Sequence, residues 1–130
     1  MARAVSERVV VSFPASADLS AYLYHIVYIN SSGEVALAAT KATQSFGVLQ
    51  NKPTAAGQPA EVCVLGGTKL RAGDTLSAGG IFMADTATGH AMACTPADAT
   101  AYILGRVLED AVDGQIVSAV VNCVCPMRAA

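Results

Sequence analysis

Short runs of apolar and β-branched residues, separated by turns that contain glycine or asparagine, make up most of this chain. The run at 22–29 is rich in tyrosine, isoleucine and valine, and residues 30–33 lead from it into a second apolar run at 34–38. Asn-Ser-Ser-Gly between two such runs is typical of a hairpin turn. The pattern therefore predicts a β-hairpin over residues 22–38.

Further strands are expected at residues 45–50, 60–65, 103–109 and 116–124, with a broad loop around Pro53 and Gly57 and a turn at 110–114. Glycines recur at 66–67, 73, 79–80 and 89, which leaves room for strands of only about four to six residues. Residues 95–102 permit one helical turn, with Thr95 as its cap and Pro96 in its first position. The sequence predicts an all-β fold, a small barrel or sandwich, with at most one short helix.

One stretch of the pattern occurs twice. Gly47-Val48-Leu49-Gln50, Gly57-Gln58 and Val62-Cys63-Val64 are echoed by Gly105-Arg106-Val107-Leu108-Glu109, Gly114-Gln115 and Val120-Val121. The echo indicates that the chain is built from short strands joined by glycine turns.

The first residues differ from the rest of the chain in their mixture of charge and β-branched residues. We expect residues 1–16 to form an extended N-terminal arm and residues 17–130 a single β-rich domain. Two interpretations of the apolar stretch Val9, Val10, Val11 and Phe13 stay open: it adds as a strand to a neighbouring subunit, or it forms the first edge strand of the same domain.

Composition narrows the functional classes. Of 130 residues 53% are hydrophobic but only 5% aromatic, and tryptophan is absent, so the apolar content is mostly alanine and valine. Such small side chains bury little area, and we expect support from partner subunits. The net charge of −2 with no basic run argues against nucleic-acid binding. No apolar run reaches the roughly 18 residues of a membrane span, and no signal peptide is evident.

Candidate chemistry is sparse. We expect Cys63, Cys94, Cys123 and Cys125 to be reduced thiols and no metal site, because nothing in the sequence brings His25 and His90 together. Neither histidine has a nearby acid to orient it, so no catalytic activity and no cofactor are expected. Two segments, 71–76 and 85–89, resemble a carrier-domain turn and an aspartic-protease loop, but plain turns explain both.

In the order of its motifs the chain resembles the small capsid decoration, or cement, proteins of tailed bacteriophages. The resemblance spans about residues 17–124 and rests on the order of these motifs: Asp18-Leu19-Ser20, Gly33-Glu34-Val35-Ala36-Leu37-Ala38, Phe46-Gly47-Val48-Leu49-Gln50-Asn51, Ala56-Gly57-Gln58, Val62-Cys63-Val64, Lys69-Leu70-Arg71-Ala72-Gly73-Asp74, Asp85-Thr86-Ala87-Thr88-Gly89 and Leu104-Gly105-Arg106-Val107-Leu108-Glu109. It implies a β-tulip-like module, made in the host cytoplasm, that decorates the outer surface of the expanded head and commonly forms homotrimers.

The resemblance implies two partners, the major capsid protein and other copies of this chain. For the first we expect the surface Val9, Val10, Val11 and Phe13 to add as a strand. For the second, a face made of Tyr22, Tyr24 and Tyr28 is the candidate, the alternative being that these tyrosines belong to the chain's own core. Other functions remain open: a phage tail or baseplate component, or a carrier or ligand-binding β-barrel, for which a modified Lys52 or Lys69 would be needed.

Overall fold

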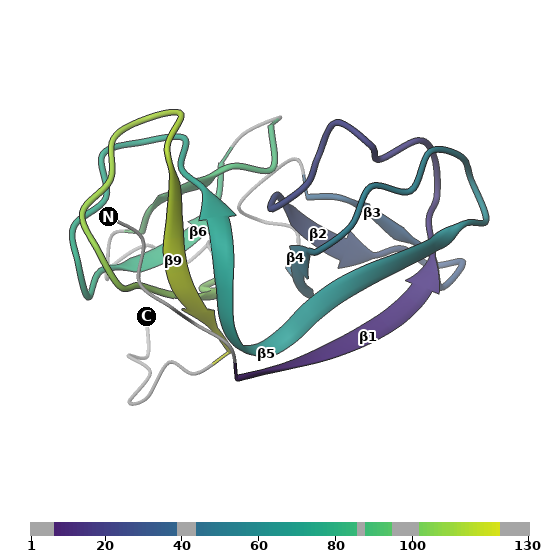
Figure 1. Cartoon of the computed structure of the whole chain (residues 1–130), viewed down its shortest axis with the longest axis horizontal. Helices are drawn as coiled ribbons and strands as arrows, with labels where there is room; N and C mark the ends of the chain where they lie inside the picture. The colour runs from purple at the N-terminus through teal and green to yellow at the C-terminus, as the bar shows by residue number, and fades with distance from the viewer. Residues whose placement is uncertain (1–6, 39–43, 86–87, 95–101, 123–130) are drawn as a thin grey trace.

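The computed structural model describes residues 7–38, 44–85, 88–94 and 102–122, and these form an antiparallel β-structure (Figure 1). The strands are β1 Arg8–Pro14, β2 Ile26–Ile29, β3 Val35–Leu37, β4 Gly47–Leu49, β5 Pro59–Arg71, β6 Ile81–Ala84, β7 Ala91–Ala93, β8 Gly105–Val107 and β9 Ile116–Val121. None of the described residues is helical, which confirms the all-β fold class. The helical turn expected at 95–102 lies outside the described residues except for Tyr102.

The strands form one curled sheet in the order β3-β2-β4-β5-β9-β8-β6-β7, and β1 pairs with β5. The hairpin expected around residues 30–33 is present as β2 and β3. The turn expected at 85–89 falls between the paired strands β6 and β7, and its residues 86–87 lie outside the described residues. All strand pairs are antiparallel, and the pairs β2–β3 and β6–β7 join strands that are consecutive in the chain through short turns.

Strand β5 contradicts the expectation of strands of four to six residues. It spans 13 residues and passes through Gly66 and Gly67, where a strand end was expected. At Gly66 the backbone has φ +99°, and an added Cβ would lie 2.5 Å from the carbonyl oxygen of Glu7. These glycines permit a bend and a close approach instead of ending the strand. Figure 1 shows β5 running beside β1, turning sharply and continuing beside β9.

The bend divides the described structure into a first half, residues 9–65, and a second half, residues 66–122, with the same order of strands. In the first half the β2–β3 hairpin is followed by β4 and β5; in the second the β6–β7 hairpin is followed by β8 and β9. Five consecutive pairs, from Val10↔Cys63 to Pro14↔Pro59, recur from Gly67↔Val120 to Arg71↔Ile116. Each half also closes through a parallel bridge directly after its first strand, Ala15↔Val35 and Ala72↔Ala91.

The sequence echo marks equivalent positions in the two halves. A Cβ on Gly47 would lie 2.2 Å from the Cys63 carbonyl oxygen, and one on Gly105 would lie 1.9 Å from that of Val120. The echoed Gly-Gln turns match as well, because Gly57 donates its backbone N–H to Ala15 and Gly114 donates its own to Ala72, both at 2.8 Å. Strand packing therefore requires glycine at positions 47 and 105.

Two hydrophobic clusters form the core. The smaller lies in the first half: Ala15, Leu19, Val27, Val35, Leu49, Ala60 and Val62. Their counterparts in the second half are Ala72, Leu76, Phe82, Ala91, Val107, Val117 and Ala119, all within the larger cluster. That larger cluster also takes in Ile26, Ala38, Val48 and Cys63 from the first half. The two halves are thus joined through an apolar contact as well as through β5.

Candidate interaction surfaces

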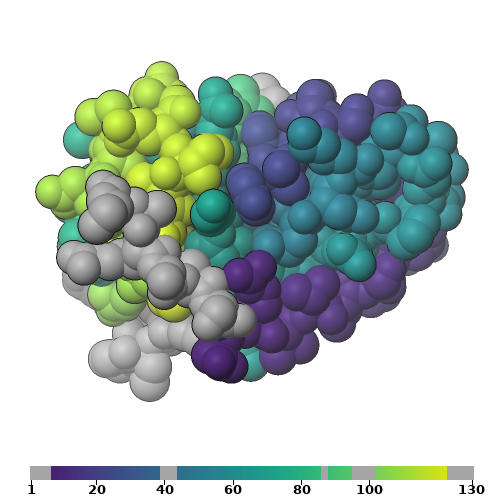
Figure 2. Space-filling model, viewed as in Figure 1, coloured from purple at the N-terminus to yellow at the C-terminus, as the bar shows by residue number. Residues whose placement is uncertain are grey.

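Within the arm expected at residues 1–16, the stretch from Val9 to Phe13 is, in this structure, part of an edge strand of the same domain. Val9 pairs with Leu65 of β5, and the side chains of Val9, Val10 and Leu65 are 48%, 43% and 45% exposed. Val11 is half-buried, as is Phe13, whose ring packs edge-on against Phe46 with centroids 5.6 Å apart. Figure 2 shows β1 in purple as a band along the lower surface.

Of the two interpretations left open, the structure shows the edge strand. The described part of β1 pairs only with β5, and Val9 and Val10 on this strand are exposed. An edge strand with exposed apolar side chains is the feature to which an extended segment of a partner protein can add. Residues 1–6 of the expected arm lie outside the described residues.

The three tyrosines do not share one face. Strand β2 begins at Ile26 and not at Tyr22, and Tyr24 has φ +65°, which no regular strand adopts. Tyr22 donates its N–H to Leu19 in a turn, and its ring packs on the smaller core cluster. Tyr24 and Tyr28 pack against the larger cluster. All three are partly buried against the chain's own core, as the alternative interpretation expected.

A pair of histidines lies where the two halves meet. The rings of His25 and His90 have centroids 4.7 Å apart, although 65 residues separate them in the sequence. His25 is 6% exposed, and its Nδ1 lies 3.0 Å from the carbonyl oxygen of Leu23. Burial lowers the pKa of His25 below 6.5, and the positive charges of His90 and Arg71 lower it further. The hydrogen bond to the Leu23 carbonyl and the carboxylate of Asp85 raise the pKa, but by less than the lowering.

Sequence reasoning missed this pair, because it depends on how the halves pack and no local signal marks it. The surroundings do not make a metal centre: within the described residues, no three His, Cys, Asp or Glu side chains are grouped to hold an ion. Cys63 and Cys94 are buried, while Cys123 and Cys125 lie outside the described residues. We interpret the histidine pair as part of the contact between the halves.

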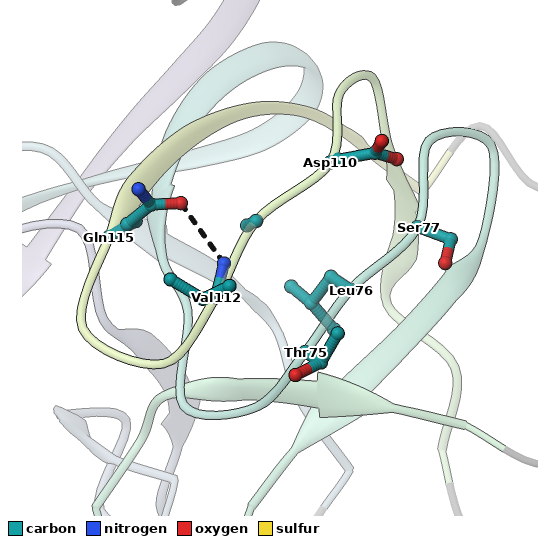
Figure 3. Close-up of a pocket in the computed structure, with 7 residues that line it drawn as sticks. Thr75, Leu76, Ser77, Asp110, Val112 and Gln115 are labelled. Atoms are coloured by element: carbon teal, nitrogen blue, oxygen red, sulfur yellow. Dashed lines mark hydrogen bonds between the residues drawn. The ribbon is translucent and has the colours of Figure 1, made fainter.

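A shallow cavity of about 350 Å³ opens between the loop after β5 and the loop before β9 (Figure 3). Its polar groups hold these loops in place: Gln115 Oε1 accepts a hydrogen bond from the Val112 N–H at 3.0 Å, and Asp110 Oδ1 accepts one from the Ala78 N–H at 2.8 Å. Val112 at the rim is 54% exposed. The cavity therefore offers an apolar rim and side chains already engaged in stabilising the loops.

The remaining candidate segments are structural. Gly73 and Asp74 form a bend after β5, and Asp74 Oδ1 accepts the N–H of Thr75 at 2.8 Å. Lys69 lies inside β5 opposite Ser118, and not at the tip of a hairpin where a carrier lysine would be presented. In the part of the chain that is described, no helix is long and apolar enough to cross a membrane.

The chain shares its fold with a phage protein. It is similar to the structure of the head fiber gp8.5 N base of bacteriophage phi29, with a TM-score of 0.61 and 23% identity over 88% of this chain and 95% of that chain. No family model matches the chain, and no curated protein does. At this identity the likeness establishes the fold class, a small all-β domain that spans both halves.

Proposed function

We propose that this protein is a structural component of a phage virion, and more specifically a decoration protein on the outer surface of the head. The observation that carries the proposal is the fold shared with the phi29 head fiber base over nearly the full length of both chains. The motif resemblance to cement proteins points to the same class independently. We propose no catalysis and no cofactor for it.

The proposed role is to stabilise the expanded head across the seams between capsomers. A protein that binds only the expanded lattice stabilises it by mass action, by about 2.7 kcal/mol per site when its free concentration is 100 times its Kd. Symmetry repeats each contact over the whole shell, so modest individual interfaces suffice. A chain with few charges and with exposed valines such as Val9, Val10 and Val112 suits such packing contacts.

The major capsid protein is the proposed partner, and β1 is the proposed contact. Its exposed pair Val9 and Val10 lies on the edge strand, where an extended capsid segment could add backbone hydrogen bonds and cover both side chains. Nucleic acid and membranes are not proposed as partners. The protein is proposed to associate with itself as a homotrimer.

The test is binding to purified heads. The full chain is mixed with expanded and unexpanded capsids of its phage, and occupancy and capsid melting are measured after sedimentation. We expect saturable binding to expanded heads with a higher melting temperature. Equal binding to both forms, or to neither, would contradict the role.

The contact surface is tested with matched valine variants. Val9→Lys with Val10→Lys should abolish binding, because each lysine would carry an unpaired charge into the covered interface. Val112→Lys, at a valine of the second half that is somewhat more exposed than Val9 and Val10, is the control and should bind as the parent chain does. Deleting residues 2–16 would not be informative, since Phe13 and Ala15 contribute to the core of the first half.

A second candidate is the base of a head fibre, favoured by the description of the phi29 neighbour. In that case the chain would attach to the head and carry a further protein. Purifying heads decorated with the native protein and identifying what co-sediments distinguishes the two roles. A tail or baseplate location, the third alternative, predicts absence from tailless expanded heads, and a carrier barrel predicts an added mass on Lys52 or Lys69.

A further inference from the structure

The outer faces of the two halves carry equivalent rows of side chains with different burial. In the first half Ile26 pairs with Val48 and Val48 with Cys63, which places the three side by side across β2, β4 and β5. All three are 0% exposed. In the second half the same positions hold Ile81, Arg106 and Val120, likewise paired in a row across β6, β8 and β9, and all three are partly exposed.

The first row is buried because the second half packs on it. The β6–β7 turn of the second half lies directly on β2, where the N–H of Ile26 donates to the carbonyl of Gly89 at 2.7 Å. Gly89 is so close that an added Cβ would lie 2.3 Å from Leu37 Cδ1. His90, the next residue, stacks on His25. A hairpin turn of one half thus packs against the start of β2 and the end of β3 of the other, next to the Ile26 end of the row.

The first half has a corresponding turn, one residue shorter than the β6–β7 turn, in which residues 86–87 lie outside the described residues. In the β2–β3 turn the Asn30 N–H donates to Glu34 at 2.9 Å, as the Asp85 N–H does to His90 in the β6–β7 turn. Gly33 and Gly89 have φ +77° and +72°. Unlike Gly89, Gly33 is exposed, and a Cβ there would meet nothing within 4 Å among the described residues. The molecule therefore has one docked and one exposed copy of the turn.

We propose that copies of this chain associate head to tail, with the β2–β3 turn of one copy on the row Ile81, Arg106 and Val120 of the next. The contact repeats between chains the contact that joins the halves within one chain. It also supplies charge complementarity. Glu34 takes the place of His90, and the counterpart of His25 is Gly80, which adjoins Gly79, whose carbonyl accepts the Arg106 guanidinium at 2.9 Å. In the proposed contact the carboxylate of Glu34 pairs with the guanidinium of Arg106 of the neighbouring copy.

A head-to-tail contact uses two different surfaces, so it continues from copy to copy until the rotation closes into a ring. The inference rests on the self-association included in the proposed function and gives it a surface; it does not depend on capsid binding. Partly exposed Ile81 and Val120 provide the apolar centre of the contact, and the ion pair fixes its register.

Charge exchange tests the proposal on the full chain, with sedimentation velocity and light scattering over a range of concentrations. The parent chain should form a closed oligomer. Arg106→Glu and Glu34→Arg should each raise the dissociation constant by about tenfold or more, and the double variant should restore assembly. Restoration separates a contact between copies from loss of the Arg106 hydrogen bond to the Gly79 carbonyl, which is 2.9 Å long in the parent.

A pair of glycine variants provides a second test that needs no charge. Gly33→Ala adds a methyl group at the proposed contact, whereas Gly57→Ala adds one at a turn of similar φ, +88°, that is also open to solvent. Both should lower the melting temperature alike, but only Gly33→Ala should abolish assembly. A parent chain that stays monomeric at all concentrations, a double charge variant that is not restored, or equal assembly of the two alanine variants would overturn the proposal. Binding of the same variants to expanded heads is measured separately, so that failure of self-association and failure of decoration are distinguished.

Discussion

Replacing Gly105 with alanine tests the close packing on which both halves depend. The added Cβ would lie 1.9 Å from the carbonyl oxygen of Val120 and 2.9 Å from the Cα of Val121. Both are backbone atoms of a paired strand, so no side-chain rotation relieves the contact. An ordinary carbon–oxygen contact is about 3.3 Å long, so strand β8 must move away from β9 by more than about 1 Å to relieve the overlap.

The cost follows from what that movement breaks. Strand β8 pairs with β9 at Gly105↔Val121, Arg106↔Val120 and Val107↔Ala119, and Val107 is 1% exposed in the larger core cluster. Loss of two or three ladder hydrogen bonds at about 1 kcal/mol each, with loosening of a buried valine, amounts to about 3–4 kcal/mol. That is a large part of the 5–15 kcal/mol typical of a small domain.

The measurement is urea unfolding of the variant by far-UV circular dichroism, with the free energy of unfolding taken from the midpoint and slope. The matched control is Gly79→Ala, where φ is +81° but an added Cβ meets nothing within 4 Å. We expect the control to lose about 1–2 kcal/mol from backbone strain alone. A Gly105→Ala variant as stable as the control would refute the packing argument for both echoed glycines.

Three further outcomes are expected. Gln58→Ala and Gln115→Ala each remove a side-chain oxygen that accepts a backbone N–H within its own turn, at 2.6 and 3.0 Å. Each variant should lower the free energy of unfolding in urea by about 1 kcal/mol. Because the two turns belong to different halves, the losses should add in the double variant. His25 has a pKa lowered by burial, so the unfolded chain binds a proton more readily; stability should be complete above the unfolded pKa of about 6.5 and fall as the pH drops from there through the folded pKa, a slope that His25→Gln should flatten in melting experiments between pH 7.5 and 5. Phe82 is fully buried, and Phe82→Ala should lower the free energy of unfolding by about 3–5 kcal/mol. The control Val112→Ala, at an exposed position, should change it by less than about 0.5 kcal/mol.

Local chemistry explains which parts of the fold could be predicted. The hairpin at Asn30–Gly33 and the turn at Asp85–Gly89 depend on residues within a few positions of each other, since Asn30 Oδ1 accepts the N–H of Ser32 and of Glu34. Such contacts form whatever the distant chain does. The same local reasoning failed at residues 66–67. A glycine pair predicts a strand end, but here the glycines allow the backbone near Glu7 to approach β5, a contact that the local sequence does not indicate.

The amino-acid order by itself determined the β-class, the positions of most turns and the existence of a repeated pattern, because alternation and turn residues act over short distances. Tertiary structure alone decided that the repeat forms two equivalent halves sharing β5, that Tyr22 and Tyr24 precede the strand, and that His25 meets His90. These depend on contacts between residues tens of positions apart, and such contacts are set by the packing of whole strands. For the same reason the exposed row on the second half could be recognised only by comparison with its buried counterpart on the first.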